Sequence, residues 1–334
     1  MIELVSVIIP CYNAEKTIKF AIQSVLAQTY SHIEIIVIND GSSDKSGDIV
    51  LQMKEHSRYK ITLFNQTNLG VSSARNKGID NASGKYILFL DADDVIAPDT
   101  IALLVNGLEQ NDCDVAYCKY TRKKYDRTKN CVYQLEAQET LLEKQLNMRK
   151  FKLAFSTYLY IREKIRKNRI IFPINLKYGE DRVFTTNYLL CCKRGIYLNK
   201  ALYYYTKTSM SSMNNVNWQM TDSLKATKII EHLLFSNKVM TAYSDYLYPR
   251  SVWALVKNFS VGDRWDLFQR ADSEYQIAKQ MKKLLYLQQT EISVKITAAL
   301  YIINEKLFFQ LIKNAAQMYD NIHRSRMARD QKSF

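Results

Sequence analysis

The sequence contains little glycine and proline, 9 and 4 of its 334 residues, and it lacks both common glycine-rich phosphate loops. No G-x-G-x-x-G motif is present, which argues against a dinucleotide-dependent dehydrogenase. No G-x-x-x-x-G-K-[ST] motif is present either, which argues against a P-loop NTPase.

Long apolar segments are also missing. The chain has no run of 18 apolar residues, and its first residues do not form a basic and then apolar cleavable leader. A membrane-spanning helix needs about 20 predominantly apolar residues, and a secretory leader has that two-part pattern. We therefore expect a chain that neither spans a membrane nor is exported, and that works in the cytoplasm.

Cysteine and histidine are few and scattered. Four histidines and six cysteines occur without a C-x-x-C pair, so the sequence predicts neither a zinc site nor a disulfide framework. The cysteines are Cys11, Cys113, Cys118, Cys131, Cys191 and Cys192. We expect them to be reduced thiols.

Charge is unevenly distributed along the chain. The net charge is +14, but residues 1–110 carry 9 Lys or Arg against 13 Asp or Glu, whereas the other 224 residues carry 38 against 20. Such a basic region can bind nucleic acid, anionic lipid or a phosphorylated substrate. We expect no nucleic-acid partner, because no helix-turn-helix, zinc-finger or RNP-type signature is present.

Apolar periodicity in the first half predicts alternating strands and helices. The predicted strands are 5–10, 33–39, 61–65, 86–90 and 115–120, and the predicted helices are 14–28, 72–81 and 100–110. This alternation is typical of an α/β fold with a parallel sheet. We expect residues 1–120 to form a doubly wound, nucleotide-binding type of domain, with an appended region because 334 residues exceed a single core.

Polar turns follow the first three predicted strands, at residues 10–13, 40–42 and 68–70. The fourth strand ends in Asp91, Asp93 and Asp94. Carboxyl ends of parallel strands meet at one edge of a sheet, so these groups can converge on one ligand. We interpret the carboxylates as a metal-diphosphate site. The alternative is that Asp93 and Asp94 cap and start the next helix.

Four segments, in order, resemble the signatures of family 2 glycosyltransferases of the GT-A fold. They are VSVIIPCYN at 5–13, VINDGSSD at 37–44, NLGVSSARN at 68–76 and DADD at 91–94. The resemblance covers residues 3–210. It implies a GT-A catalytic domain at 1–217, with a nucleotide-sugar-binding half at 1–120 and an acceptor-binding half at 121–217, followed by a mainly helical C-terminal region at 218–334.

The resemblance implies transfer of a sugar from a nucleotide-sugar donor, usually a UDP-sugar, with inversion at the anomeric carbon. By position, Asp40 resembles the carboxylate that accepts from the uracil N3–H, and the backbone from Pro10 to Tyr12 borders the uridine. Asn68 and Arg75 resemble residues that complete the nucleoside end. The alternatives are that Asp40 only caps a helix and that Arg75 is only a surface helix residue.

The same resemblance assigns the Asp-x-Asp motif. Asp91 resembles its ribose-side acid and Asp93 its metal ligand, with Asp91 as a second candidate ligand and Ala92 beside the donor. The cation implied is Mn²⁺ or Mg²⁺, which bridges diphosphate oxygens and neutralises the charge of the leaving group.

A base is also needed to take the proton of the acceptor hydroxyl. Glu180 and Asp181 resemble the family's Glu-Asp motif, which implies Asp181 as the base and Glu180 as a supporting or acceptor-binding residue. The alternative is a helix-capping acid pair offset by Arg182. Lys207 resembles a basic residue that reaches the diphosphate before a closing loop, and a plain solvated lysine is the alternative.

Beyond residue 218 the sequence predicts helices at 218–237, 239–258, 271–287 and 291–323. The last carries an apolar stripe and is followed by basic residues. The stripe comprises Leu300, Ile303, Leu307, Phe308, Leu311, Ile312, Ala315, Met318, Tyr319 and Ile322, and the basic residues are Arg324, Arg326 and Arg329. The pattern leaves open whether these helices form core, a homo-oligomer seam or a surface that rests on the inner membrane.

We therefore expect a metal-dependent, inverting hexosyl- or N-acetylhexosaminyltransferase that extends a bacterial cell-surface polysaccharide or glycolipid. Its partners would be a nucleotide-sugar donor and a glycan or lipid-linked glycan acceptor. The alternatives are a nucleotidyltransferase acting on a sugar phosphate and a non-catalytic scaffold that binds nucleotide-sugar.

Overall fold

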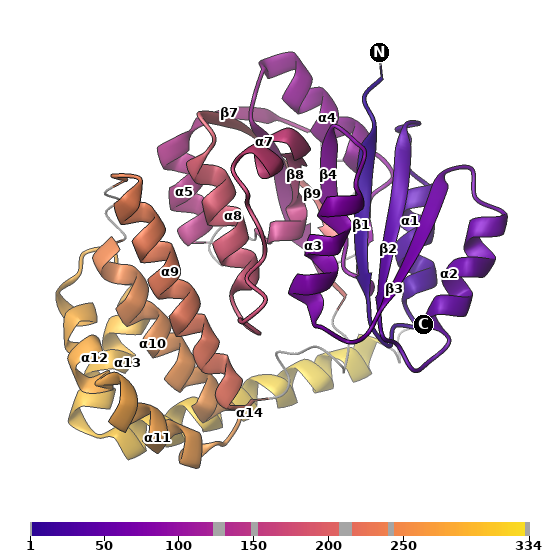
Figure 1. Cartoon of the computed structure of the whole chain (residues 1–334). Coiled ribbons are helices and arrows are strands. Elements are labelled where there is room, and N and C mark those ends of the chain that lie inside the picture. Colours follow the sequence, from indigo (N-terminus) through magenta and orange to yellow (C-terminus); the bar gives the residue numbers. More distant parts are fainter. Residues whose placement is uncertain (1, 123–130, 148–152, 207–215, 240–243, 331–334) are drawn as a thin grey trace. The chain divides into compact units, whose positions relative to one another are not determined.

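The computed structural model describes residues 2–122, 131–147, 153–206, 216–239 and 244–330, with the backbone alone at residues 244 and 320–330. The chain divides into two compact units, Met1–Ser209 and Met210–Phe334. The first unit holds the sheet, and the second is helical over the part described (Figure 1).

The sheet of the first unit is mixed and mostly parallel in its first half. Its strands are β1 (Val5–Cys11), β2 (Ile33–Asp40), β3 (Lys60–Gln66), β4 (Tyr86–Phe89), β5 (Val95–Ile96), β6 (Val115–Thr121), β7 (Tyr133–Ala137), β8 (Tyr158–Ile161) and β9 (Arg194–Tyr204). Their order is β3-β2-β1-β4-β8-β6-β9-β5, with β7 paired to β9. β1 runs parallel to β2 and β4, and β2 runs parallel to β3. This confirms the predicted doubly wound, mostly parallel sheet.

Helices cover both faces of this sheet (Figure 1). They are α1 (Ile18–Leu26), α2 (Ser46–Glu55), α3 (Val71–Asn81), α4 (Thr100–Asn111), α5 (Gln138–Leu146), α7 (Arg162–Lys167) and α8 (Glu180–Leu190), with a 3-10 turn η1 (Phe155–Thr157). Successive strand residues point to opposite faces. Val7 and Ile9 therefore join the core under α1, whereas Ile8 meets α3, where a Cβ at Gly78 would overlap the Ile8 side chain.

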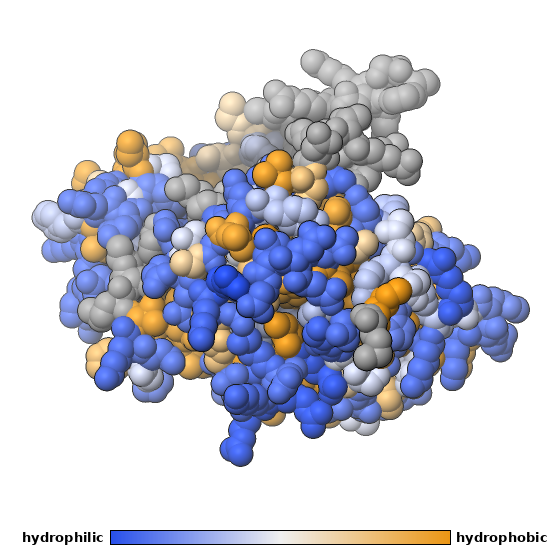
Figure 2. All heavy atoms as spheres, turned by 90° about the horizontal axis from the view of Figure 1, so that it is seen from above, coloured by the Kyte–Doolittle hydropathy of each residue, from blue (hydrophilic) through white to orange (hydrophobic). Residues whose placement is uncertain are grey.

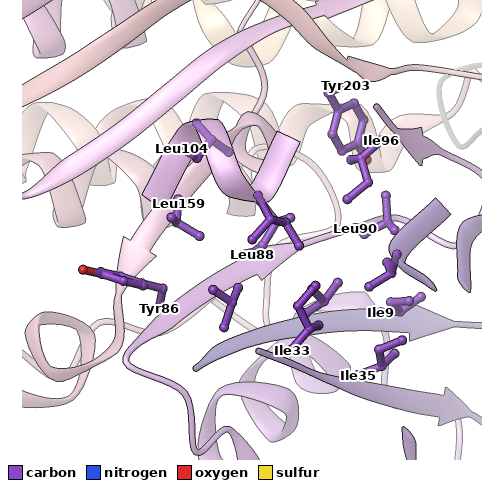
Figure 3. Close-up of a cluster of buried hydrophobic side chains, with 14 of the residues drawn as sticks. Ile9, Ile33, Ile35, Tyr86, Leu88, Leu90, Ile96, Leu104, Leu159 and Tyr203 are labelled. Atoms are coloured by element: carbon purple, nitrogen blue, oxygen red, sulfur yellow. The ribbon is translucent and has the colours of Figure 1, made fainter. Parts of the chain in front are cut away.

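The main core lies on the α1 and α4 side of the sheet. Figure 3 shows its buried side chains from neighbouring strands: Ile9, Ile33, Ile35, Tyr86, Leu88, Leu90, Ile96, Leu104, Leu159 and Tyr203. An aromatic group lies on the other side, because Phe89 follows Leu88 and points the opposite way. Phe89 contacts Phe155, Phe172 and Phe184 at centroid distances of 5.3–5.7 Å. Each fully buried side chain of this kind contributes about 1.5–3 kcal/mol.

The structure differs from the sequence analysis of the first half in two details, and it excludes one alternative. The helix predicted from residue 14 begins at Ile18, because residues 14–17 form a turn in which Ala14 accepts from the Thr17 and Ile18 amides. β8 was not foreseen, and it enters antiparallel between β4 and β6. Asp93 and Asp94 do not start a helix, because β5 follows them and α4 begins only at Thr100.

The second unit contains η3 (Trp218–Thr221), α9 (Asp222–Ser236), α10 (Ser244–Val261), α11 (Trp265–Tyr275), α12 (Ile277–Tyr286), α13 (Ile292–Ile303) and α14 (Glu305–Asp330). Two helices predicted as continuous are broken. Gln276 has a left-handed φ of 49° between α11 and α12. Asn304 is extended, and its Oδ1 accepts from the Leu307 amide at 2.9 Å, which starts a new helix.

The predicted apolar stripe on the last helix is divided by this break. Phe308 is buried against Phe268 and Tyr301, whereas Ile303, Leu307 and Leu311 are exposed. Across the described residues, no helix combines the length and apolar character needed to cross a bilayer. The face in Figure 2 is mostly hydrophilic, with small groups of hydrophobic side chains scattered over it.

Candidate active site

The polar turns predicted to converge lie at one edge of the sheet. β1 and β2 end together, with Cys11 opposite Asn39 in the parallel register. The turns that follow are joined by hydrogen bonds: the Asn13 amide donates to Ser42 Oγ at 3.0 Å, and the Ser43 amide donates to Asn13 Oδ1 at 2.9 Å. Asn13 has a positive φ of 47°, which lets the chain turn back toward β2.

Asp40 closes the next turn of this edge. Its Oδ1 accepts from the Leu69 amide at 2.9 Å and from Gln66 Nε2 at 2.8 Å, and its Oδ2 accepts from the Gly70 amide at 2.9 Å. Asp40 is therefore not a helix cap, because α2 begins only at Ser46. The carboxylate holds the turn after β3 beside the end of β2. Its role toward a uracil ring stays a prediction.

Tyr12 and Asn68 are exposed at this edge, and Pro10 is buried in β1. Gly41 must be glycine here, since its φ is +74° and a Cβ would lie 2.7 Å from the Asn68 amide nitrogen. The exposed ring of Tyr12 and the backbone groups of the turns after β1 and β3 are available to a planar base. That arrangement is compatible with the nucleoside roles that the resemblance implies.

The Asp-x-Asp loop follows β4 directly. Asp91 and Asp93 are half-exposed and Ala92 is buried. No group of three or more metal-binding side chains occurs among the residues that the structure describes. Two accessible carboxylates nevertheless fit a hard divalent cation whose other ligands come from a diphosphate and water. Mn²⁺ or Mg²⁺ thus suits these donors. Two carboxylates do not suffice for a metal held by protein ligands alone, such as a structural zinc ion.

Asp94 has a structural part that the sequence analysis missed. Its carboxylate accepts from the Tyr203 hydroxyl and from the Thr206 amide, both at 2.7 Å. The Tyr203 hydroxyl in turn accepts from the Asp91 amide at 3.3 Å. Burial and the nearby Asp91 raise the pKa of Asp94 to about 8, against these hydrogen bonds. The loop is therefore tied at two points to the end of β9.

Arg75 lies in the interior, which contradicts the interpretation of it as a surface helix residue. Its Nη2 donates to Asp91 at 3.0 Å and its Nη1 donates to Glu180 at 3.0 Å. The guanidinium lies 4.1 Å from the ring centroid of Phe155. Burial alone would lower the pKa of Arg75, but Asp91 and Glu180 raise it. The spacing Ser72, Arg75, Ile79 on the buried side of α3 was a signal for this burial.

Glu180 and Asp181 form the first turn of α8, after Gly179 with its φ of 88°. The positive end of the helix dipole favours negative charge there. Burial and then Asp181 raise the pKa of Glu180, and Arg75 opposes them. Asp181 is half-buried, and its Oδ1 accepts from the Arg182 amide at 2.7 Å. Their positions agree with the family motif and equally with helix-start acids.

Arg75 therefore links the two acidic motifs of the chain, and its partner Glu180 lies 105 residues away from it along the sequence. On one side of Arg75, Asp91 and Asp93 offer carboxylate oxygens to a cation at the sheet edge. On the other side, Asp181 offers a carboxylate at the start of α8. Such a pair can bind a nucleoside diphosphate and take a proton from a nearby hydroxyl. Lys207, the remaining predicted site residue, lies outside the described residues.

Comparison with known proteins agrees with this arrangement. The family model described as Glycosyl transferase family 2 matches residues 6–172. The chain is 36% identical over 219 residues to EpsJ, an uncharacterized glycosyltransferase of Bacillus subtilis (strain 168), and the match covers 63% of each chain. It is 33% identical over 253 residues to YibD, an uncharacterized glycosyltransferase of Escherichia coli (strain K12), covering 70% of this chain and 73% of YibD. The chain thus spans less than two thirds of EpsJ.

A similar fold occurs in the crystal structure of S. aureus TarS 1–349 in complex with UDP-GlcNAc. The TM-score is 0.63 at 21% sequence identity, and the match covers 94% of this chain and 92% of that one. This similarity confirms the GT-A type of fold predicted from the motifs. The family match over residues 6–172 and the 33% identity to YibD over 73% of its length show that the chain belongs to glycosyl transferase family 2.

Proposed function

We propose that this glycosyltransferase moves a sugar from a UDP-sugar to a hydroxyl of a glycan acceptor, with inversion at the anomeric carbon and with a divalent cation. The observation that carries the proposal is the buried Arg75, which joins the Asp91 end of the donor edge to the Glu180 and Asp181 turn at 3.0 Å on each side. Donor and acceptor chemistry would then take place in one rigid unit.

Binding of the donor follows from the sheet edge. The turns after β1, β2 and β3 would enclose the uridine, and Asp91 and Asp93 would hold Mn²⁺ or Mg²⁺ against the diphosphate. When bound, the cation would offset the charge that develops on the departing diphosphate. The binding of UDP-GlcNAc by TarS, which has a similar fold, supports a UDP-sugar as the donor class.

Transfer would use Asp181 as the base. The acceptor oxygen attacks the anomeric carbon from the face opposite the diphosphate, the bond from that carbon to the diphosphate oxygen breaks, and Asp181 takes the hydroxyl proton. Arg75 would keep Glu180 in place beside the base, because it pairs with that side chain inside the protein. A lipid-linked glycan at the cytoplasmic face of the membrane is the acceptor that we propose, with residues 121–217 forming the acceptor side.

The donor half of the proposal is tested by nucleotide release. The purified protein is incubated with UDP-, GDP- and CMP-sugars and Mn²⁺, with and without EDTA. We expect release of UDP alone, abolished by EDTA and by Asp93→Ala but retained in Asp48→Ala, whose side chain is exposed on α2. Pyrophosphate release from UTP and a sugar phosphate would instead show a nucleotidyltransferase, and tight UDP binding without turnover would show a binding protein.

The acceptor half is tested by Asp181→Asn. This variant should bind UDP as the original protein does, because the carboxylate acts on the acceptor after the donor is bound, yet transfer to acceptor should fall by about 10²–10⁴-fold as expected for loss of a general base. Unchanged transfer would exclude Asp181 as the base.

A further inference from the structure

A basic surface segment leads into the Glu180 and Asp181 turn. Residues 164–179 cover the end of α7 and the connection to α8, and we call them the basic segment. It contains five Lys or Arg and no Asp or Glu. The cations are Lys164, Arg166, Lys167, Arg169 and Lys177. None of them has a part in the proposed transfer.

The basic segment is anchored from inside, although it is irregular after α7 (Figure 1). Asn76 of α3 clamps Phe172 from both sides, donating to its carbonyl and accepting from its amide at 2.8 Å each. Phe172 stacks on Phe184 of α8 at a centroid distance of 3.9 Å. Ile170 and Leu176 are also buried. The outward residues between these anchors are therefore held in place.

Two of those outward residues are isoleucines. Ile171 is 62% exposed and Ile174 is 72% exposed. Arg166, Lys167 and Arg169, which shortly precede them in the sequence, are exposed as well. Within the described part of the chain, no ion pair is formed by these three cations, whereas Lys164 pairs with Asp114 at 3.1 Å. The segment thus combines exposed positive charges with exposed apolar side chains.

This combination fits an anionic lipid surface. Cations near a negatively charged leaflet each strengthen binding by about fivefold, and apolar side chains beside them can enter the boundary between headgroups and acyl chains. A solvated protein face would mix both charge signs and would not need exposed isoleucines at fixed positions. The absence of any acid over 16 residues makes charge complementarity the strongest argument for this partner.

We propose that the basic segment docks on an anionic membrane, with Ile171 and Ile174 entering the headgroup region. The segment runs directly into α8, so docking would bring Asp181 to the membrane surface. A lipid-linked acceptor could then reach the base without leaving the bilayer. This last step depends on the proposed function, whereas the docking itself does not.

Vesicle sedimentation with the full chain tests the docking. One set of vesicles is phosphatidylcholine alone, and the other is phosphatidylcholine mixed with phosphatidylglycerol. We expect binding to the mixed vesicles only, weakening as salt is added because surface charges are screened. Replacing Arg166, Lys167 and Arg169 by Gln should weaken this binding by about a hundredfold. Ile171→Ser with Ile174→Ser should weaken it about tenfold or more.

Matched controls separate this surface from other exposed apolar residues. Phe20→Ser on α1, 59% exposed, and Ile303→Ser on α13, 80% exposed, should leave vesicle binding unchanged. Melting temperature and affinity for UDP report whether each variant is folded. Loss of binding in Ile303→Ser but not in the basic-segment variants would overturn the proposal and move the surface to the second unit. Absence of binding to either kind of vesicle would also overturn it.

Two further outcomes are informative. If light scattering shows that the basic-segment variants dissociate a dimer while vesicle binding is unaffected, a second copy occupies the surface and the proposal is wrong. Metal-dependent UDP release is measured without lipid, so its absence contradicts the proposed function and leaves the docking result standing. If the original protein releases UDP but does not bind vesicles, only the membrane proposal is contradicted.

Discussion

The hydroxyl of Tyr203 fixes the Asp-x-Asp loop through two hydrogen bonds, so its removal tests the role of that loop. It donates to Asp94 at 2.7 Å and accepts from the Asp91 amide at 3.3 Å. Tyr203→Phe removes both bonds and leaves the buried Asp94 carboxylate and the Asp91 amide without this hydroxyl. The cost expected for such a change is about 1–3 kcal/mol of unfolding free energy. In a unit of this size, each kcal/mol lowers the melting temperature by about 2–4 °C.

Tyr188→Phe is a matched control. The Tyr188 hydroxyl is also buried, also donates once, to the Asp114 carbonyl at 2.8 Å, and also accepts once, from the Ile161 amide at 2.8 Å. We expect the two variants to lose similar stability. Only Tyr203→Phe should raise the Mn²⁺ concentration that gives half-maximal UDP release, by about fivefold if 1 kcal/mol of loop ordering is lost. Equal metal dependence in both variants would refute the link between Tyr203 and the metal loop.

Two other substitutions address the interior of the first unit. Arg75→Gln leaves Asp91 and Glu180 without their cation and should lower the free energy of unfolding by about 3–5 kcal/mol, measured in urea. Arg75→Lys should keep the affinity for UDP, measured by calorimetry, within about twofold. A large loss of affinity in the lysine variant would favour a direct contact of Arg75 with the nucleoside. Glu34 is buried, and although burial raises its pKa, hydrogen bonds from Ser6, Ser83 and the Gly84 amide hold it below its usual value. The stability that the ionised Glu34 contributes is therefore complete above about pH 4.3, the ordinary pKa of glutamate, and is lost as the pH falls through the lowered pKa. Glu34→Gln should destabilise the protein at pH 7 and make its melting temperature depend less on pH in acid. An unchanged acid dependence in this variant would contradict that account.

Local patterns predicted what depends on local residues. The strands at β1 to β4 are runs of β-branched and apolar residues, and each polar turn at their carboxyl ends was placed from sequence alone. β8 could not be foreseen, because its four residues Tyr158–Ile161 become a strand only by pairing with β4 and β6. The same holds for Arg75. Its partner Glu180 is 105 residues away, so only the fold shows that the arginine is an internal bridge.

In the second unit, the apolar periodicity predicted a longer helix than the structure has. A continuous apolar periodicity across residues 291–323 predicts one helix, since the spacing at Asn304 agrees with helical phase. The asparagine side chain accepts from the Leu307 amide instead, so a backbone bond is replaced by a side-chain bond and the chain turns. The Asn304 side chain thus caps the start of a second helix where the periodicity predicted a continuous one.

The distribution of charge changes where the acceptor is expected to meet the protein. Within the basic part of the chain, residues 111–209 carry 21 Lys or Arg against 9 Asp or Glu, and residues 210–334 carry 17 against 11. Most of the positive excess therefore belongs to the same unit as the candidate site. A positive surface beside a binding site raises the local concentration of anions and speeds their association. A nucleotide-sugar and a lipid-linked acceptor that carries phosphate would both be attracted by it. Added salt should therefore slow association of the donor with the first unit, even where no single lysine touches it.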